Sequence, residues 1–262
     1  MPSKTWIDDG TRIRIDGDGP TVVLAHGVLM DMGMWERQVA GLAKDHRVVR
    51  FDMWGHGGST DPAGPRTLDD FVGQLAKVVA IAGDRGPPAL VGFSMGGLLA
   101  QAFAVQQSGA LDRLVLMNAV YDRSADQARA SAARLADFER SGIAGCAEAT
   151  VQRWFTEAER ETLAREIALI EGWMRAGDEA AKLKAYRVFA TAGGSLVGKL
   201  DRIGCPTLVL TGEHDVGSTA EMARRMAAEI PGARLEIVPE QRHMMGVVAA
   251  AEVNRILRAF LA

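Results

Sequence analysis

The sequence has little cysteine, little net charge and no long apolar run, and each shortage excludes a class of protein. The two cysteines, Cys146 and Cys205, lie far apart and fit no metal-ligand spacing, so we expect free thiols in a reducing compartment and no metal. A net charge of −3 leaves no basic surface for nucleic acid. No run of 18 apolar residues occurs, and residues 1–6 lack a basic segment followed by an apolar one. We therefore expect a cytoplasmic protein without membrane attachment.

The chain has the size and composition of one large domain. Its 262 residues are 48% hydrophobic, and a chain of this length can bury roughly 70 to 75% of its unfolded surface in a single core. No repeat or low-complexity linker divides it. The sequence leaves the oligomeric state open.

The most informative motif is the pentapeptide at residues 92–96, Gly-Phe-Ser-Met-Gly, which follows the apolar run at residues 88–91. A G-x-S-x-G pattern after a strand predicts a sharp turn into a helix, with the serine strained and exposed at the turn. The pattern makes Ser94 a candidate nucleophile. Because glycine and serine are also common in ordinary turns, the prediction depends on partner residues.

A serine hydroxyl needs a base and an acid to become a nucleophile, and both follow downstream. Asp215 comes just after the strand-like residues 207–210, and His243 follows the strand-like residues 235–238. A final helical pattern covers residues 247–261. The order Ser94, Asp215, His243 is that of the α/β-hydrolases and differs from the orders of chymotrypsin and subtilisin.

Two further motifs strengthen the resemblance to the α/β-hydrolase superfamily of serine hydrolases. The buried-strand run at residues 22–25 ends in His26 and Gly27, which resembles the His-Gly motif of the oxyanion loop. The resemblance implies that the N–H groups of Val28 and Met95 form the oxyanion hole. Residues 52–59 resemble the D-x-x-G-x-G-x-S turn of the same superfamily, where the turn is largely architectural.

Strand-like and helical segments alternate along most of the chain. Such alternation predicts a mostly parallel, twisted α/β sheet with helices on both faces and the active site at the carboxyl ends of the strands. The predicted strands cover residues 11–15, 22–26, 47–51, 89–93, 113–117, 207–211 and 234–238.

The interval between Met117 and Thr207 is too long for a simple crossover. It is rich in Ala, Arg and Glu at helical spacing and has no convincing strand. We predict an inserted helical cap at residues 122–200, here called the helical insertion, between two parts of a hydrolase core at residues 1–121 and 201–262. A cap over the serine excludes water and supplies the substrate pocket.

The helical insertion also resembles the cap of bacterial 3-oxoadipate enol-lactonases, on residues 151–156, 186–189 and 200–203. That resemblance implies that a cap arginine or tryptophan faces a substrate that carries carboxylates. Arg153, Trp154 and Arg187 are the candidates. The alternative for each is an exposed arginine or a tryptophan packed in the cap.

The chain departs from that family near the acid and the histidine. Residues 216–220 lack the Thr-Pro that often begins the next helix, and Met244 and Met245 follow His243 where relatives often carry polar residues. Several methionines lie near the catalytic motifs and suggest an adaptable apolar pocket, with core packing as the alternative. These are Met30, Met32, Met34, Met53, Met95, Met244 and Met245.

One rival for the acid role is Asp122, just past the strand that ends near Met117, because some α/β-hydrolases take their carboxylate from that strand. We favour Asp215, since its context of Gly212-x-x-Asp215 directly follows the expected strand.

The sequence thus predicts a serine hydrolase that cleaves a small-molecule carboxylic ester or lactone through an acyl-enzyme on Ser94, with water as co-substrate and no cofactor. The same triad also serves C–C bond, amide and carbamate hydrolysis. Perhydrolase or haloperoxidase activity is a further alternative, and a ligand receptor without turnover is the alternative outside enzymes.

Overall fold

The computed structural model, described for residues 3–262, is built on one eight-stranded sheet with the strand order β1-β2-β4-β3-β5-β6-β7-β8. Strands β3 to β8 pair in parallel, whereas β1 and β2 run antiparallel at one edge. The strands are β1 (Lys4–Asp8), β2 (Thr11–Asp16), β3 (Thr21–Ala25), β4 (Arg47–Phe51), β5 (Ala89–Phe93), β6 (Leu114–Met117), β7 (Thr207–Gly212) and β8 (Arg234–Val238). The mostly parallel sheet and its seven predicted strands are confirmed.

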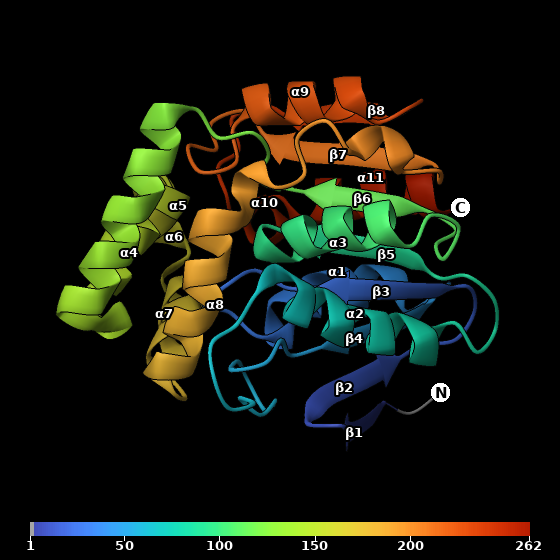
Figure 1. The fold of residues 1–262 in the computed structure, drawn as a ribbon, viewed down its shortest axis with the longest axis horizontal. Coiled ribbons are helices and arrows are strands. Elements are labelled where there is room, and N and C mark those ends of the chain that lie inside the picture. Colours follow the sequence, from blue (N-terminus) through green and yellow to red (C-terminus); the bar gives the residue numbers. More distant parts are fainter. Residues whose placement is uncertain (1–2) are drawn as a thin grey trace.

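Helices cover both faces of the sheet, as predicted (Figure 1). Helices α1 and α11 pack together on one face, and α2 and α3 pack together on the other. The final helix is interrupted near Ala249 and so forms two helices rather than one. The helices outside the helical insertion are α1 (Glu36–Leu42), α2 (Leu68–Ala82), α3 (Met95–Gln106), α9 (Ala220–Glu229), α10 (Met245–Val248) and α11 (Ala250–Leu261), with short 3-10 turns at η1 (Met32–Trp35) and η3 (Leu200–Arg202).

Between β6 and β7 the chain forms five helices, which gather at one end of the sheet (Figure 1). They are α4 (Ala125–Gly145), α5 (Ala147–Trp154), α6 (Glu157–Thr162), α7 (Ala164–Arg175) and α8 (Glu179–Thr191), followed by the 3-10 turn η2 (Ala192–Gly194). None of the helices in residues 3–262 combines the length and the apolar character that crossing a bilayer requires.

Both ends of the helical insertion are fastened to α9. At the first end, Arg225 donates to the Asp122 carbonyl at 2.7 Å and pairs with its carboxylate at 3.4 Å. At the other end, the Glu229 carboxylate accepts a hydrogen bond from the Leu200 N–H at 2.7 Å, and it also accepts one from the hydroxyl of Tyr121, which precedes the first end. One helix of the core therefore fixes where the insertion leaves and re-enters the sheet.

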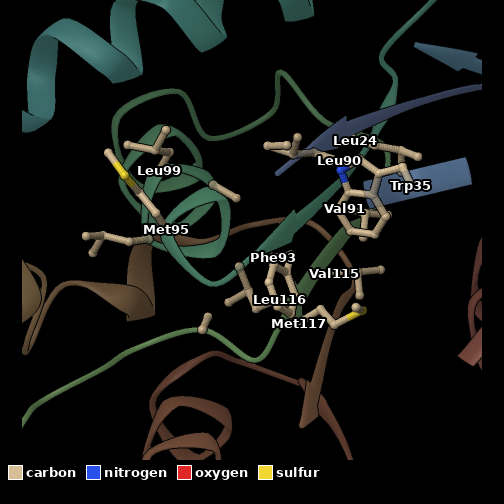
Figure 2. Close-up of a cluster of buried hydrophobic side chains, with 14 of the residues drawn as sticks. Leu24, Trp35, Leu90, Val91, Phe93, Met95, Leu99, Val115, Leu116 and Met117 are labelled. Carbon is tan, nitrogen blue, oxygen red and sulfur yellow. The ribbon is translucent and has the colours of Figure 1, made fainter. Parts of the chain in front are cut away.

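The core lies between the central strands and their flanking helices. Figure 2 shows Leu24, Val91 and Leu116 from three neighbouring strands together with Trp35 and Leu99 from the flanking segments. All five side chains are at most 1% exposed. Strands buried on both faces read as continuous apolar runs, which is why the sequence marks them clearly.

Two buried histidines join the loops after β3 and β4. His26 Nε2 accepts a hydrogen bond from the Met53 N–H at 2.8 Å, and His56 Nε2 accepts one from the Leu29 N–H at 3.1 Å. Because a backbone N–H can only donate, each ring carries its proton on Nδ1 and is neutral. Burial lowers the pKa of both rings, that of His56 to about 3. Both histidines are therefore neutral and have a structural role, which is to hold the loops after β3 and β4 together.

We expect Leu116→Ala to lower the free energy of unfolding by about 2 to 5 kcal/mol, because it leaves a cavity in the centre of the sheet. Leu169→Ala is the matched control, since Leu169 is 54% exposed. Chemical denaturation of both variants measures the difference. Equal losses of unfolding free energy in the two variants would contradict the placement of Leu116 in the core.

We expect the pH dependence of stability to change in His56→Gln. An unfolded histidine takes up a proton near pH 6.5, whereas folded His56 does so only near pH 3, so the wild type loses stability as the pH falls through this window. The contribution is roughly 1.4 kcal/mol per pH unit. A glutamine amide accepts the same N–H without titrating. Denaturation between pH 7 and pH 4.5 should give a shallower slope for the variant, and identical slopes would refute the neutral ring.

Candidate active site

Ser94 lies at the sharp turn between β5 and α3, as the pentapeptide predicts. Its backbone has φ 54° and ψ −111°, which is a strained conformation for a residue other than glycine. Neighbouring glycines permit the turn, because a Cβ on Gly92 would lie 2.3 Å from the Gly96 carbonyl oxygen and one on Gly96 would lie 2.2 Å from the Ala25 carbonyl oxygen. The turn thus presents the serine hydroxyl at the carboxyl end of β5.

Asp215 and His243 come together from the ends of β7 and β8. Asp215 Oδ2 lies 2.7 Å from His243 Nδ1, and both residues are at most 5% exposed. Burial alone would raise the pKa of Asp215, but its interaction with the His243 imidazole and its hydrogen bonds from Ser218 and Asn118 together outweigh burial and lower the pKa below its usual value. An ionised carboxylate only accepts, so Nδ1 carries the histidine proton and Nε2 remains a base.

Asp215 is held by three further donors. The N–H groups of Gly217 and Ser218 donate to Oδ1 at 2.8 and 3.0 Å, and the Asn118 amide donates to Oδ2 at 2.8 Å. Every one of these bonds favours the charged form. The rival acid, Asp122, instead pairs with Arg225 on the outside of the sheet.

Ser94 and His243 line one pocket, together with Val28, Leu29 and Asp215. Among the described residues, no hydrogen bond joins the Ser94 hydroxyl to the imidazole; such contacts in serine hydrolases commonly tighten when substrate binds. The imidazole packs against Phe93, with ring centres 4.8 Å apart. It also stacks on Trp154 of α5, with ring centres 5.5 Å apart and an interplanar angle of 29°.

Arg242, next to His243 in the sequence, fastens the end of α5. Its guanidinium donates to the carbonyl oxygens of Gln152 and Phe155 at 3.2 and 2.9 Å. These bonds keep Trp154 over the imidazole. The helical insertion therefore forms one wall of the pocket, and Trp154 and Arg153 both line it.

The segments that carry the two N–H groups of the predicted oxyanion hole are joined next to Ser94. The Gly96 N–H donates to the His26 carbonyl at 3.1 Å and so joins the start of α3 to the loop after β3. The N–H groups of Val28 and Met95 lie on these two joined segments, and neither has an acceptor among residues 3–262. Unpaired N–H groups at a helix start are free to hold a developing negative charge.

The pocket also contains three arginines: Arg123, Arg134 and Arg153. None of them forms an ion pair with any carboxylate that the structure describes. Arg123 is fixed by hydrogen bonds to the carbonyls of Phe189 and Ala190 at 3.0 and 3.3 Å. Burial lowers its pKa to about 10. Burial also lowers the pKa of Arg153, with a further contribution from the charge of Arg134.

Two sets of residues that the sequence offered for the pocket lie outside its described lining. Arg187 is absent from the described lining, because its guanidinium points outward and pairs with Glu139 at 2.8 Å. Of the two interpretations of the seven methionines, the structure agrees with core packing, since all seven are at most 6% exposed and none is in the described lining. The methionines pack in the core. The sequence analysis did not identify Arg123 and Arg134 as residues that line the pocket.

Within residues 3–262, one cluster brings three potential metal ligands together: Glu213, His214 and Glu240. All three are exposed on the surface, and none is in the described lining of the pocket. Carboxylates gather in this way on many protein surfaces without binding an ion, so the cluster is an ordinary feature of the surface.

Comparison with known proteins agrees with this geometry. The chain is 33% identical over 245 residues, 94% of its length and 91% of the relative, to (E)-2-((N-methylformamido)methylene)succinate hydrolase of Acinetobacter baylyi. It is 24% identical over 249 residues, 93% of its length and 89% of the relative, to 3-oxoadipate enol-lactonase 2 of the same organism.

Among solved structures, the enol-lactonase of Burkholderia xenovorans LB400 superposes with a TM-score of 0.85 at 28% identity, over 98% of this chain and 99% of that one. The family model described as "Alpha/beta hydrolase family" matches residues 22–256. The strained serine turn, the parallel sheet and these matches agree, and the chain belongs to the alpha/beta hydrolase family.

Proposed function

We propose that the protein is a serine hydrolase that cleaves an acyl bond in a small molecule carrying carboxylates. The observation that carries this proposal is the placement of strained Ser94 in one pocket with the buried Asp215–His243 pair. In this proposal Ser94 is the nucleophile, His243 is the general base and acid, and Asp215 orients the imidazole.

The proposed reaction has two halves. His243 Nε2 takes the hydroxyl proton while Ser94 Oγ attacks the carbonyl carbon, and the N–H groups of Val28 and Met95 hold the resulting oxyanion. The imidazolium then gives its proton to the leaving group, and an ester forms on Ser94. Water repeats the attack with His243 as its base, which releases the acid and restores the serine. Asp215 stabilises the transient imidazolium.

The arginines support a carboxylate-bearing substrate. The three guanidinium groups are half-buried and have no carboxylate partner among the described residues, and an anion in the pocket would supply that partner. Two relatives are named for acids of this kind, a substituted succinate and 3-oxoadipate. Trp154 would exclude water above the imidazole and provide an apolar wall beside the reacting carbonyl.

An ester or lactone is our first candidate for the bond, as the motifs of the helical insertion suggest. An amide is the second, because the relative at 33% identity is named for a substrate with a formamido group. The chemistry on Ser94 is the same for both, and the difference is the protonation of the leaving group. Steady-state rates on a matched ester and amide of one dicarboxylic acid would decide between them.

We further propose that residues 1–121 and 201–262 act as the hydrolase core and that the helical insertion, residues 122–200, acts as its cap. Residues of both parts line the pocket, which supports this division. We also place the enzyme in the cytoplasm, because Cys146 and Cys205 are both free thiols.

We expect Ser94→Ala to abolish hydrolysis, with a fall in turnover of about 10⁶-fold, because the nucleophile is lost. Multiple-turnover hydrolysis of p-nitrophenyl acetate and butyrate measures this. Ser195→Ala is the matched control, since Ser195 is exposed on the helical insertion. Activity of Ser94→Ala within tenfold of the wild type would disprove the assignment. A single-equivalent burst in the wild type would instead favour a receptor.

We expect Asp215→Asn to lower turnover by roughly 10⁴-fold, because the amide no longer holds the required tautomer of His243. Asp122→Asn is the control and should stay within about threefold, since Asp122 only pairs with Arg225. Both are measured with the same esters. A larger loss in Asp122→Asn would transfer the acid role to that residue.

A further inference from the structure

A second hollow lies between α4 and α5, next to the pocket around Ser94. The pocket around Ser94 holds about 40 Å³ of free space, whereas the second hollow holds about 270 Å³. On the same measure, the second hollow therefore offers more room than the pocket around Ser94. Arg134 and Arg153 line both spaces and form their common wall.

The outer hollow combines an apolar floor with excess positive charge. Phe138 and Ala149 contribute the apolar surface. Arg140 and Asp137, which also line it, pair with each other and so nearly cancel. Arg134 and Arg153 remain, and neither has a carboxylate partner among residues 3–262. Two adjacent guanidinium groups repel each other unless an anion lies between them.

We infer that the outer hollow is a second substrate subsite, which takes an acidic arm of the substrate that extends away from the scissile bond. The carboxylate of this arm lies between Arg134 and Arg153, and its carbon chain passes over Phe138 and Ala149. Arg123, which lines only the inner pocket, is left for an acidic group closer to the reacting carbonyl. This inference rests on the proposed function, because the arm is defined relative to the bond that Ser94 attacks.

The test measures binding rather than turnover, so that it stands apart from the proposed function. Adipate, a linear dicarboxylate, and the neutral 1,6-hexanediol are titrated calorimetrically into the Ser94→Ala protein. We expect adipate to bind at least tenfold more tightly than the diol, because charged hydrogen bonds to arginine are strong. Equal affinities would overturn the inference. Failure of the proposed function would show separately, as ester hydrolysis that survives Ser94→Ala.

The contribution of charge is tested by Arg134→Gln in the Ser94→Ala background. We expect adipate affinity to fall tenfold or more. The matched control is Arg129→Gln on the same helix, where Arg129 is an exposed partner of Asp126. Its adipate affinity should stay within twofold of the parent. Equal affinities for the two variants would overturn the role of Arg134.

The hollow itself is tested by Ala149→Trp, which fills it from α5. We expect adipate affinity to fall tenfold or more, whereas Ala136→Trp, exposed on α4 and absent from the described lining, should leave it unchanged. Thermal unfolding checks that both variants fold, and Ala149→Leu is the smaller replacement if the tryptophan variant does not. Unchanged adipate affinity in a folded Ala149 variant would show that the hollow is no subsite.

Discussion

The close approach of Gly96 to the end of β3 is the contact on which the rest of the site depends. No side chain fits between Gly96 and the Ala25 carbonyl, so the start of α3 packs directly against the sheet. The bond from the Gly96 N–H to the His26 carbonyl then fixes the loop that carries Val28. Ser94 is left at φ 54° because both segments that flank it are fixed, and strain of this kind persists only where the surroundings over-determine the backbone.

Polar groups in this protein fall into two classes. His26, His56 and Asp215 are buried and have full sets of partners, so they build the framework and keep defined protonation states. Arg134 and Arg153 have no carboxylate partner among the described residues, although they line the pocket. Satisfied polar groups thus shape the site, and the arginines without a carboxylate partner are the basis for the proposed carboxylate-bearing substrate.

The sequence predicted the sheet and the residues around Ser94 because both depend on local patterns. Strands buried on two faces are continuous apolar runs, and the serine turn needs its glycines at fixed spacing. Strand β1 was missed, since its residues at the sheet edge are mostly exposed and show no buried alternation. The sequence could not predict which arginines line the pocket, because Arg134 and Arg187 lie on similar amphipathic helices. Only packing decides which of the two side chains turns toward the pocket. The sequence also could not decide whether the methionines near the motifs line the pocket or pack in the core, because that too depends on packing.

The attachment of both ends of the helical insertion to α9 has a consequence for how such an enzyme can diversify. Arg225 and Glu229 hold the entry and exit points of the insertion, so the chain between them can change in length and sequence while the sheet stays intact. The residues proposed to perform the chemistry follow strand ends and are independent of that exchange. The insertion therefore resembles an interchangeable module, and its replacement would present a new substrate to an unchanged nucleophile.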